Sequence, residues 1–156
     1  MVQAINPNRI VPVQEDLTLP EDNFEIIRGW ENMNRVDKEL ADGVSALPGE
    51  WLVLGSNNKL ARPGASSVPT TYLVIAGTDR FDVAATGQAT VVMASSVIVR
   101  TKRFHSSLDT VGQPITIKNL GADVAVPSLG VVGTDNIFGW VTEVGTDYIV
   151  YETKQP

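Results

Sequence analysis

Residues 138–153 read FGWVTEVGTDYIVYET, the clearest structural signal in the chain. Two runs rich in β-branched and aromatic residues, Ile137–Val144 and Tyr148–Thr153, flank the triplet Gly145-Thr146-Asp147. Glycine tolerates the positive φ of a tight turn, while threonine and aspartate bond to the nearby backbone. The triplet therefore predicts a turn between two paired strands, and the C-terminal end of the chain is predicted to be a β-hairpin.

The same alternation of short runs and turn residues extends upstream to Pro48. Strand-like runs recur about every eight to twelve residues, which is typical of a barrel or sandwich. An α/β chain would show helical patterns between its strands. The sequence therefore predicts an all-β fold, with a small β-barrel or β-tulip/sandwich body over residues 48–156. Before the C-terminal hairpin, strands are predicted at Glu50–Leu54, Lys59–Arg62, Thr70–Ala76, Gln88–Met93, Ser96–Phe104 and Pro114–Lys118.

Residues 1–47 are predicted to form an extended acidic N-terminal arm. Three prolines within the first twenty residues exclude a regular helix there and favour extended backbone. Between Asn23 and Leu40, weak helical spacing allows a short helix, which Gly29 interrupts. The apolar residues of the arm are too sparse to form a core, so we expect them to bind a partner. These predicted partner-binding residues are Ile10, Val11, Leu17, Leu19, Phe24 and Trp30.

The formal net charge of −6 lies entirely in the first third of the chain. Residues 1–50 hold ten acidic and four basic residues, whereas residues 51–156 hold eight of each. A surface of this sign repels phosphate backbones, so we expect no binding to nucleic acid. The N-terminus lacks a basic segment followed by an apolar one, and no run of about eighteen apolar residues occurs. We therefore expect a soluble protein that binds no membrane.

The residue inventory predicts no catalytic, cofactor or metal site, and hence no enzyme. The chain has no cysteine, which excludes disulfides and thiolate chemistry. Its single histidine, His105, cannot form a His-rich metal site, and as a general base it would need a positioned partner such as Asp109. Asp79 and Asp82 could be taken for a glycosidase pair, but they follow a predicted turn and no cleft is indicated.

Two further groups of residues have a structural and a functional interpretation. Trp51 and Trp140 lie in apolar strand runs, so we expect them in the core rather than in a carbohydrate-binding platform. The basic residues Arg100, Lys102 and Arg103 would alternate between the two faces of a strand, which favours a solvated edge strand guarded by charge. The alternative is that this cluster receives an acidic arm or an acidic neighbour.

The order of these segments resembles the capsid decoration (cement) proteins of tailed bacteriophages. The resemblance extends over residues 47–153, about two-thirds of the chain, and is a pattern of turn glycines and strand residues without a signature motif. Its most suggestive part is the closing series VGQPITIK, GWVTEV and YIVYET. The stretches that carry it are LPGEWLVLGSNNKLARPG (47–64), TYLVIAGTDRFDVAATGQATVVM (71–93), SVIVRTKRF (96–104), VGQPITIKNLG (111–121) and FGWVTEVGTDYIVYET (138–153).

The resemblance implies a β-barrel or β-tulip body on the outer capsid surface and an N-terminal arm that staples neighbouring major-capsid subunits. The implied partners are the major capsid protein and neighbouring copies of this chain, in a homo-oligomer such as a trimer, with no cofactor. The implied location is the virion, after synthesis in the host cytoplasm. Two alternatives stay open: a tail-tube, tail-completion or baseplate protein, and a carbohydrate-binding module or small hydrolase, which would need exposed aromatic residues or close carboxylates.

Overall fold

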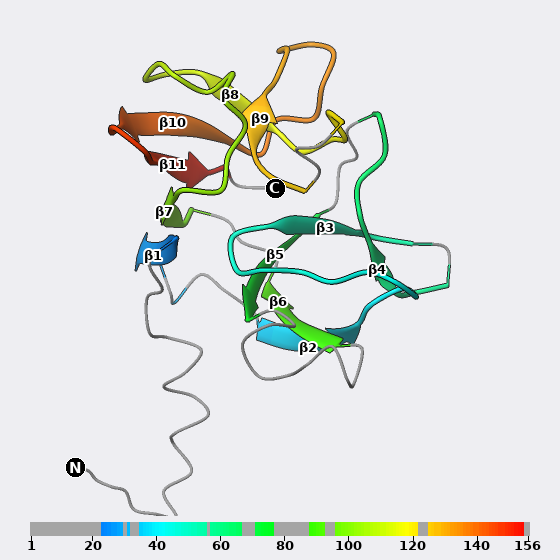
Figure 1. The fold of residues 1–156 in the computed structure, drawn as a ribbon. Coiled ribbons are helices and arrows are strands. Elements are labelled where there is room, and N and C mark those ends of the chain that lie inside the picture. The colour runs from blue at the N-terminus through cyan, green and yellow to red at the C-terminus, as the bar shows by residue number, and fades with distance from the viewer. Residues whose placement is uncertain are drawn as a thin grey trace, which may run out of the picture.

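A computed structural model of the chain is built from β-strands (Figure 1). It describes residues 23–29, 31, 35–55, 57–66, 71–76, 88–92, 96–121 and 125–154. The strands are β1 (Phe24–Arg28), β2 (Arg35–Glu39), β3 (Trp51–Leu54), β4 (Leu60–Ala61), β5 (Tyr72–Ala76), β6 (Gln88–Val92), β7 (Ile98–Thr101), β8 (Pro114–Thr116), β9 (Ser128–Leu129), β10 (Gly139–Val144) and β11 (Ile149–Thr153).

The strands form two antiparallel sheets. One has six strands in the order β1-β7-β11-β10-β8-β9, and the other has five in the order β2-β6-β5-β3-β4. The predicted all-β class is confirmed, with one sheet curled as a half-barrel. The predicted C-terminal hairpin is confirmed too, because β10 pairs with β11 from Gly139 opposite Thr153 to Val144 opposite Ile149.

The main core lies between the two sheets. One buried hydrogen bond joins them at its centre, where Trp51 Nε1 donates to Tyr151 Oη over 3.1 Å. Burial raises the pKa of the Tyr151 hydroxyl far above its ordinary value, so this group stays neutral. All but three of the core residues lie on strands of the two sheets, and Val97, Leu108 and Ile117 lie between strands. The core consists of Phe24, Ile26, Trp51, Leu73, Ile75, Val92, Val97, Val99, Leu108, Ile115, Ile117, Val141, Ile149 and Tyr151.

Removing the Tyr151 hydroxyl should destabilise the fold. In the Tyr151→Phe variant the buried indole N–H of Trp51 loses its acceptor, and an unsatisfied buried donor costs about 1–3 kcal/mol. Urea unfolding followed by tryptophan fluorescence measures the difference. The control is Tyr148→Phe, whose hydroxyl bonds the exposed Glu143 and should change stability little. Equal stability of wild type and Tyr151→Phe would mean that the Trp51–Tyr151 bond contributes nothing.

The five-stranded sheet buries apolar side chains on both faces. Leu73 and Ile75 of β5 belong to the main core, whereas Val74 between them belongs to a second buried cluster. A sheet covered on both faces carries continuous apolar runs, which explains the unbroken sequence of β5. The second cluster consists of Leu40, Ala46, Leu52, Leu60, Val74, Ala89, Val91 and Ala125, with Val44 and Tyr72 packed against it.

Residues 24–28 and 35–39 belong to the body, which corrects the predicted division at residues 47/48. β1 pairs with β7 in the six-stranded sheet, and β2 pairs with β6 in the five-stranded sheet. The short helix considered between Asn23 and Leu40 is replaced by these strands. Phe24 and Ile26, two residues apart, are buried, while Ile27 is 45% exposed, so the segment has strand rather than helix periodicity. The N-terminal arm is from here on residues 1–22, which lie outside the described residues.

Candidate interaction surface

Three exposed apolar side chains lie within four consecutive residues where the chain leaves β9. Val131 and Val132 are 55% and 66% exposed, and Leu129 is 38% exposed. We call these three residues the apolar knuckle. Valines at such exposure inside a turn bury little of their own surface in the fold, so they are available to a partner.

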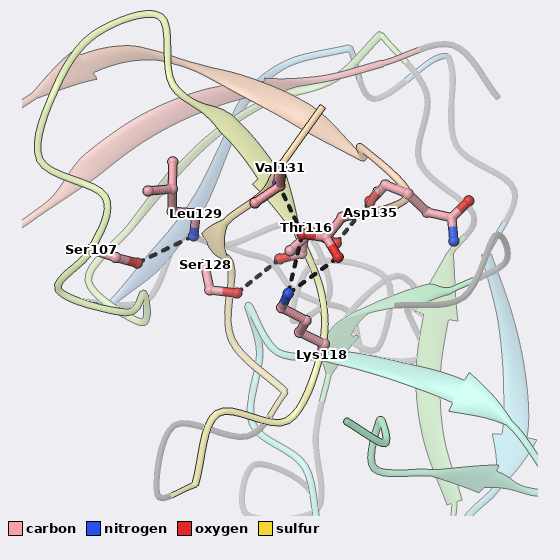
Figure 2. A network of polar contacts seen from close by, with 8 residues as sticks. Ser107, Thr116, Lys118, Ser128, Leu129, Val131 and Asp135 are labelled. Atoms are coloured by element: carbon pink, nitrogen blue, oxygen red, sulfur yellow. Dashed lines mark hydrogen bonds and ion pairs between the residues drawn. The ribbon is translucent and has the colours of Figure 1, made fainter. Parts of the chain in front are cut away.

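Asp135 fixes the backbone of the knuckle. Its Oδ2 accepts a hydrogen bond from the Val131 N–H over 2.9 Å, and the Asp135 N–H donates to the Val131 carbonyl over 2.8 Å. Both carboxylate oxygens lie 3.1 Å from Lys118 Nζ, as Figure 2 shows. The side chain of Asp135 is 7% exposed and that of Lys118 21% exposed, so this ion pair is largely shielded from water. These contacts close the loop between residues 131 and 135 and tie it to Lys118.

Further hydrogen bonds tie the base of the knuckle to its neighbours (Figure 2). The Ser128 hydroxyl donates to the Thr116 carbonyl over 3.3 Å, which links β9 to β8. The Leu129 N–H donates to Ser107 Oγ over 3.2 Å, which links β9 to the turn after β7. The Thr116 hydroxyl donates to the Asn136 carbonyl over 2.8 Å. Both ends of the loop are thus anchored to the six-stranded sheet.

Acid should weaken this anchorage. The hydrogen bond from the Val131 N–H lowers the pKa of Asp135, burial opposes this, and Lys118 lowers it further. A carboxylate with a lowered folded-state pKa stabilises the fold above its ordinary pKa, and this stabilisation is lost as the pH falls through the lowered pKa. We expect Asp135→Asn to be less stable than wild type at neutral pH, with the difference shrinking in acid. Thermal unfolding over a pH series measures this; a difference independent of pH would contradict it.

Trp140 does not lie in the core, contrary to the prediction from its sequence context. Its side chain is 42% exposed, and it lies opposite Pro114 on β8 and Glu152 on β11. Side chains alternate between faces along a strand, and the neighbour Val141 takes the core position. Trp51, in contrast, is buried as predicted. The outer face of the six-stranded sheet therefore carries an exposed aromatic side chain.

Of the basic cluster, Arg100 lies on an interior strand, and Lys102 and Arg103 follow the end of that strand. β7 lies between β1 and β11, so the predicted charge-guarded edge strand is wrong. Arg100 Nη2 contacts Glu25 Oε1 of β1 at 3.0 Å, and Lys102 Nζ contacts Asp147 Oδ2 at 3.3 Å. The alternative prediction was that this cluster receives an acidic arm or an acidic neighbour, and Glu25, which lies in the predicted arm, contacts it at Arg100.

The predicted partner-binding residues lie mostly outside the described residues. These are Ile10, Val11, Leu17, Leu19 and Trp30. The sixth, Phe24, is 5% exposed and packs in the main core, so its assignment to a partner is corrected.

His105 Nδ1 lies 2.7 Å from Ser107 Oγ, whereas the Asp109 carboxylate bonds Thr110 and Gln113. His105 and Asp109 are thus not brought together as an acid–base pair.

The knuckle was not predicted from the sequence, although a signal for it exists. Residues 130–135 read GVVGTD, in which residues 133–135 repeat the turn-forming triplet found at 145–147. Two valines enclosed by glycines in a turn have no strand neighbours to pack against, so exposure could have been expected.

Comparisons with known proteins add no relative. No family model, no curated protein and no solved structure matches this chain. Among the described residues, no group of three or more acidic or histidine side chains could hold a metal ion, and no helix is long and apolar enough to cross a membrane. The apolar knuckle and the outer face of the six-stranded sheet are the features from which a function is inferred.

Proposed function

We propose that this chain is a capsid decoration protein of a tailed bacteriophage, which binds the outer surface of the major capsid lattice and staples neighbouring subunits through its N-terminal arm. The observation that carries the proposal is the apolar knuckle, an exposed apolar surface held by a shielded ion pair. Exposed apolar patches mark sites of protein–protein contact. The resemblance in strand and turn pattern supports the assignment of that partner to a capsid.

A binding surface that is already ordered suits a protein whose function is attachment alone. Binding a loop that is already fixed avoids much of the entropy cost of ordering it, and the Asp135 contacts fix this loop beforehand. Attachment at both the knuckle and the arm would make the second contact intramolecular, which raises the overall affinity beyond either contact alone. Neither contact needs a catalytic residue.

Co-sedimentation with undecorated capsids tests the proposal. Purified protein is mixed with capsids of the parent phage that lack it, and pelleted with them. We expect saturable binding with a fixed ratio to the major capsid protein. Pelleting with isolated tails but not with capsids would replace the proposal by the tail-protein alternative.

Within this assay, Val132→Asp should weaken capsid binding about 10- to 100-fold. Burying a valine side chain contributes about 1.5–3 kcal/mol, and each 1.4 kcal/mol is a factor of ten. The matched control is Val36→Asp, the same change at another exposed valine on the edge of the five-stranded sheet. Both variants should fold normally, because both side chains are exposed. Equal binding by the two variants would show that the knuckle is not part of the interface.

A further inference from the structure

The two sheets have four edge strands, and the five-stranded sheet protects both of its own. An exposed edge is a template for pairing with another strand, so folded proteins guard edges with charge, shortness or coverage. β2 carries charged residues at four of its five positions. β4 is only two residues long, and its Leu60 carbonyl accepts the Ala41 N–H over 2.8 Å.

The six-stranded sheet protects one edge only, among the described residues. At β9, the Leu129 N–H donates to Ser107 Oγ and the Pro127 carbonyl accepts the His105 N–H over 2.8 Å. The turn after β7 therefore covers that edge. β1, at the opposite end, is paired with β7 on one side, and no described strand pairs with its other side.

The backbone of β1 shows which residues face the open edge. The Asn23 carbonyl accepts the Lys102 N–H over 2.8 Å, so Asn23 directs its backbone toward β7. Directions alternate along an antiparallel strand, so Glu25 also faces β7, while Phe24 and Ile26 face away. The one acidic side chain of β1, Glu25, is held by Arg100 and does not guard the edge. The edge thus offers hydrogen-bonding groups beside two core side chains.

The sequence directly before β1 is suited to this edge. Leu17 and Leu19 alternate with polar residues, and residues 20–23 read PEDN, a composition typical of a turn. A four-residue connection places Leu19 opposite Phe24 and Leu17 opposite Ile26. Those are the two residues whose backbone faces the edge, and the two leucines would lie on the same face as the core side chains.

We propose that the open edge of β1 binds residues 16–19 of the same chain as an additional antiparallel strand. The same chain is the favoured source, because a connection of four residues gives a far higher effective concentration than a separate molecule. If the proposed capsid function holds, residues 16–19 attach the arm to the body and residues 1–15 reach the neighbouring subunit. Only this division of the arm rests on the proposed function.

Amide hydrogen exchange of the isolated full-length protein, measured by NMR, tests the pairing. The amides of Leu17, Leu19, Phe24 and Ile26 should be protected, and that of Thr18, which would face outward, should exchange fast. Leu17→Pro removes an N–H that donates to β1 and should speed exchange at Phe24 and Ile26 about tenfold or more. Thr18→Pro is the matched control, because its N–H faces away from β1, and it should leave that exchange unchanged.

Two results would overturn the proposal. Exchange at Phe24 and Ile26 at the rate of an unstructured peptide, or equal effects of the two prolines, would show that residues 16–19 do not pair with β1. A second copy of the chain would be the occupant of the edge if two results were found together. Amide protection would rise with protein concentration, and Leu19 would contact Phe24 only between differently labelled chains. No capsid enters this experiment, so its failure leaves the capsid-binding proposal standing, and failure of capsid binding leaves the pairing standing.

Discussion

The Phe24→Ala variant should lose about 3–5 kcal/mol of unfolding free energy, the cost of truncating a core phenylalanine. The Phe24 ring is packed between the sheets, and Gly49 lies so close that an added Cβ would be 3.0 Å from the ring. Such a site has little freedom to collapse around the missing ring. Urea unfolding of the purified variant measures the loss.

The matched control for this prediction is Ile27→Ala on the same strand. Ile27 is 45% exposed, so its truncation should cost less than about 1 kcal/mol. If both variants were as stable as wild type, β1 would not be part of the folded body, and the original boundary at residues 47/48 would be restored. Because Phe24→Ala is expected to damage the fold, it is unsuitable for testing partner binding.

Deleting residues 1–22 should abolish capsid attachment while the body stays folded. The deletion removes Ile10 and Val11, which would contact the neighbouring subunit, together with residues 16–19, which would hold the arm on the body; each buried apolar anchor contributes about 1.5–3 kcal/mol. The exposed acidic residues of the arm should contribute less, about 0–1 kcal/mol per ion pair, and are screened by salt. Raising the salt concentration alone should therefore weaken attachment only modestly. Co-sedimentation with undecorated capsids measures both effects.

Two further deletions sharpen this test. Deleting residues 1–8 keeps Ile10 and Val11 and should retain most of the binding. Deleting residues 1–15 removes both of these anchors but keeps residues 16–19 on the chain, and should lose as much binding as the deletion of residues 1–22. If the deletion of residues 1–22 bound capsids as well as the full chain does, the body would carry the whole interface and the arm would have no role in attachment.

The strands that could be predicted are those bounded by turn residues. β3, β5, β6 and the β10–β11 hairpin lie within their predicted ranges, because each is a run of strand-forming residues between glycine, proline or asparagine turns. β1 and β2 could not be found this way. Their residues form strands because they pair with β7 and β6, which are distant in sequence. The local sequence, with its weak helical spacing interrupted at Gly29, indicated a short helix instead.

Side-chain direction was harder to predict than strand position. In β10, either Trp140 or Val141 could face the core, because a shift of one residue exchanges the two faces. The pairing with β8 and β11 decides which side chain faces the core. It also brings Gly139 so close to β11 that a Cβ would lie 2.4 Å from the Glu152 carbonyl oxygen, so only glycine fits there. Contacts of this kind depend on a partner strand and cannot be read from local sequence. The exposure of Trp140 follows from them.

Electron cryo-microscopy of the parent phage capsid, with and without this protein, tests the capsid proposal most directly. We predict that the difference density is a two-sheet body on the outer capsid surface, with the loop of Val131 and Val132 against the major capsid protein and an arm that reaches a neighbouring subunit. A capsid reconstruction without this density, or density for this chain within the tail alone, would contradict the account.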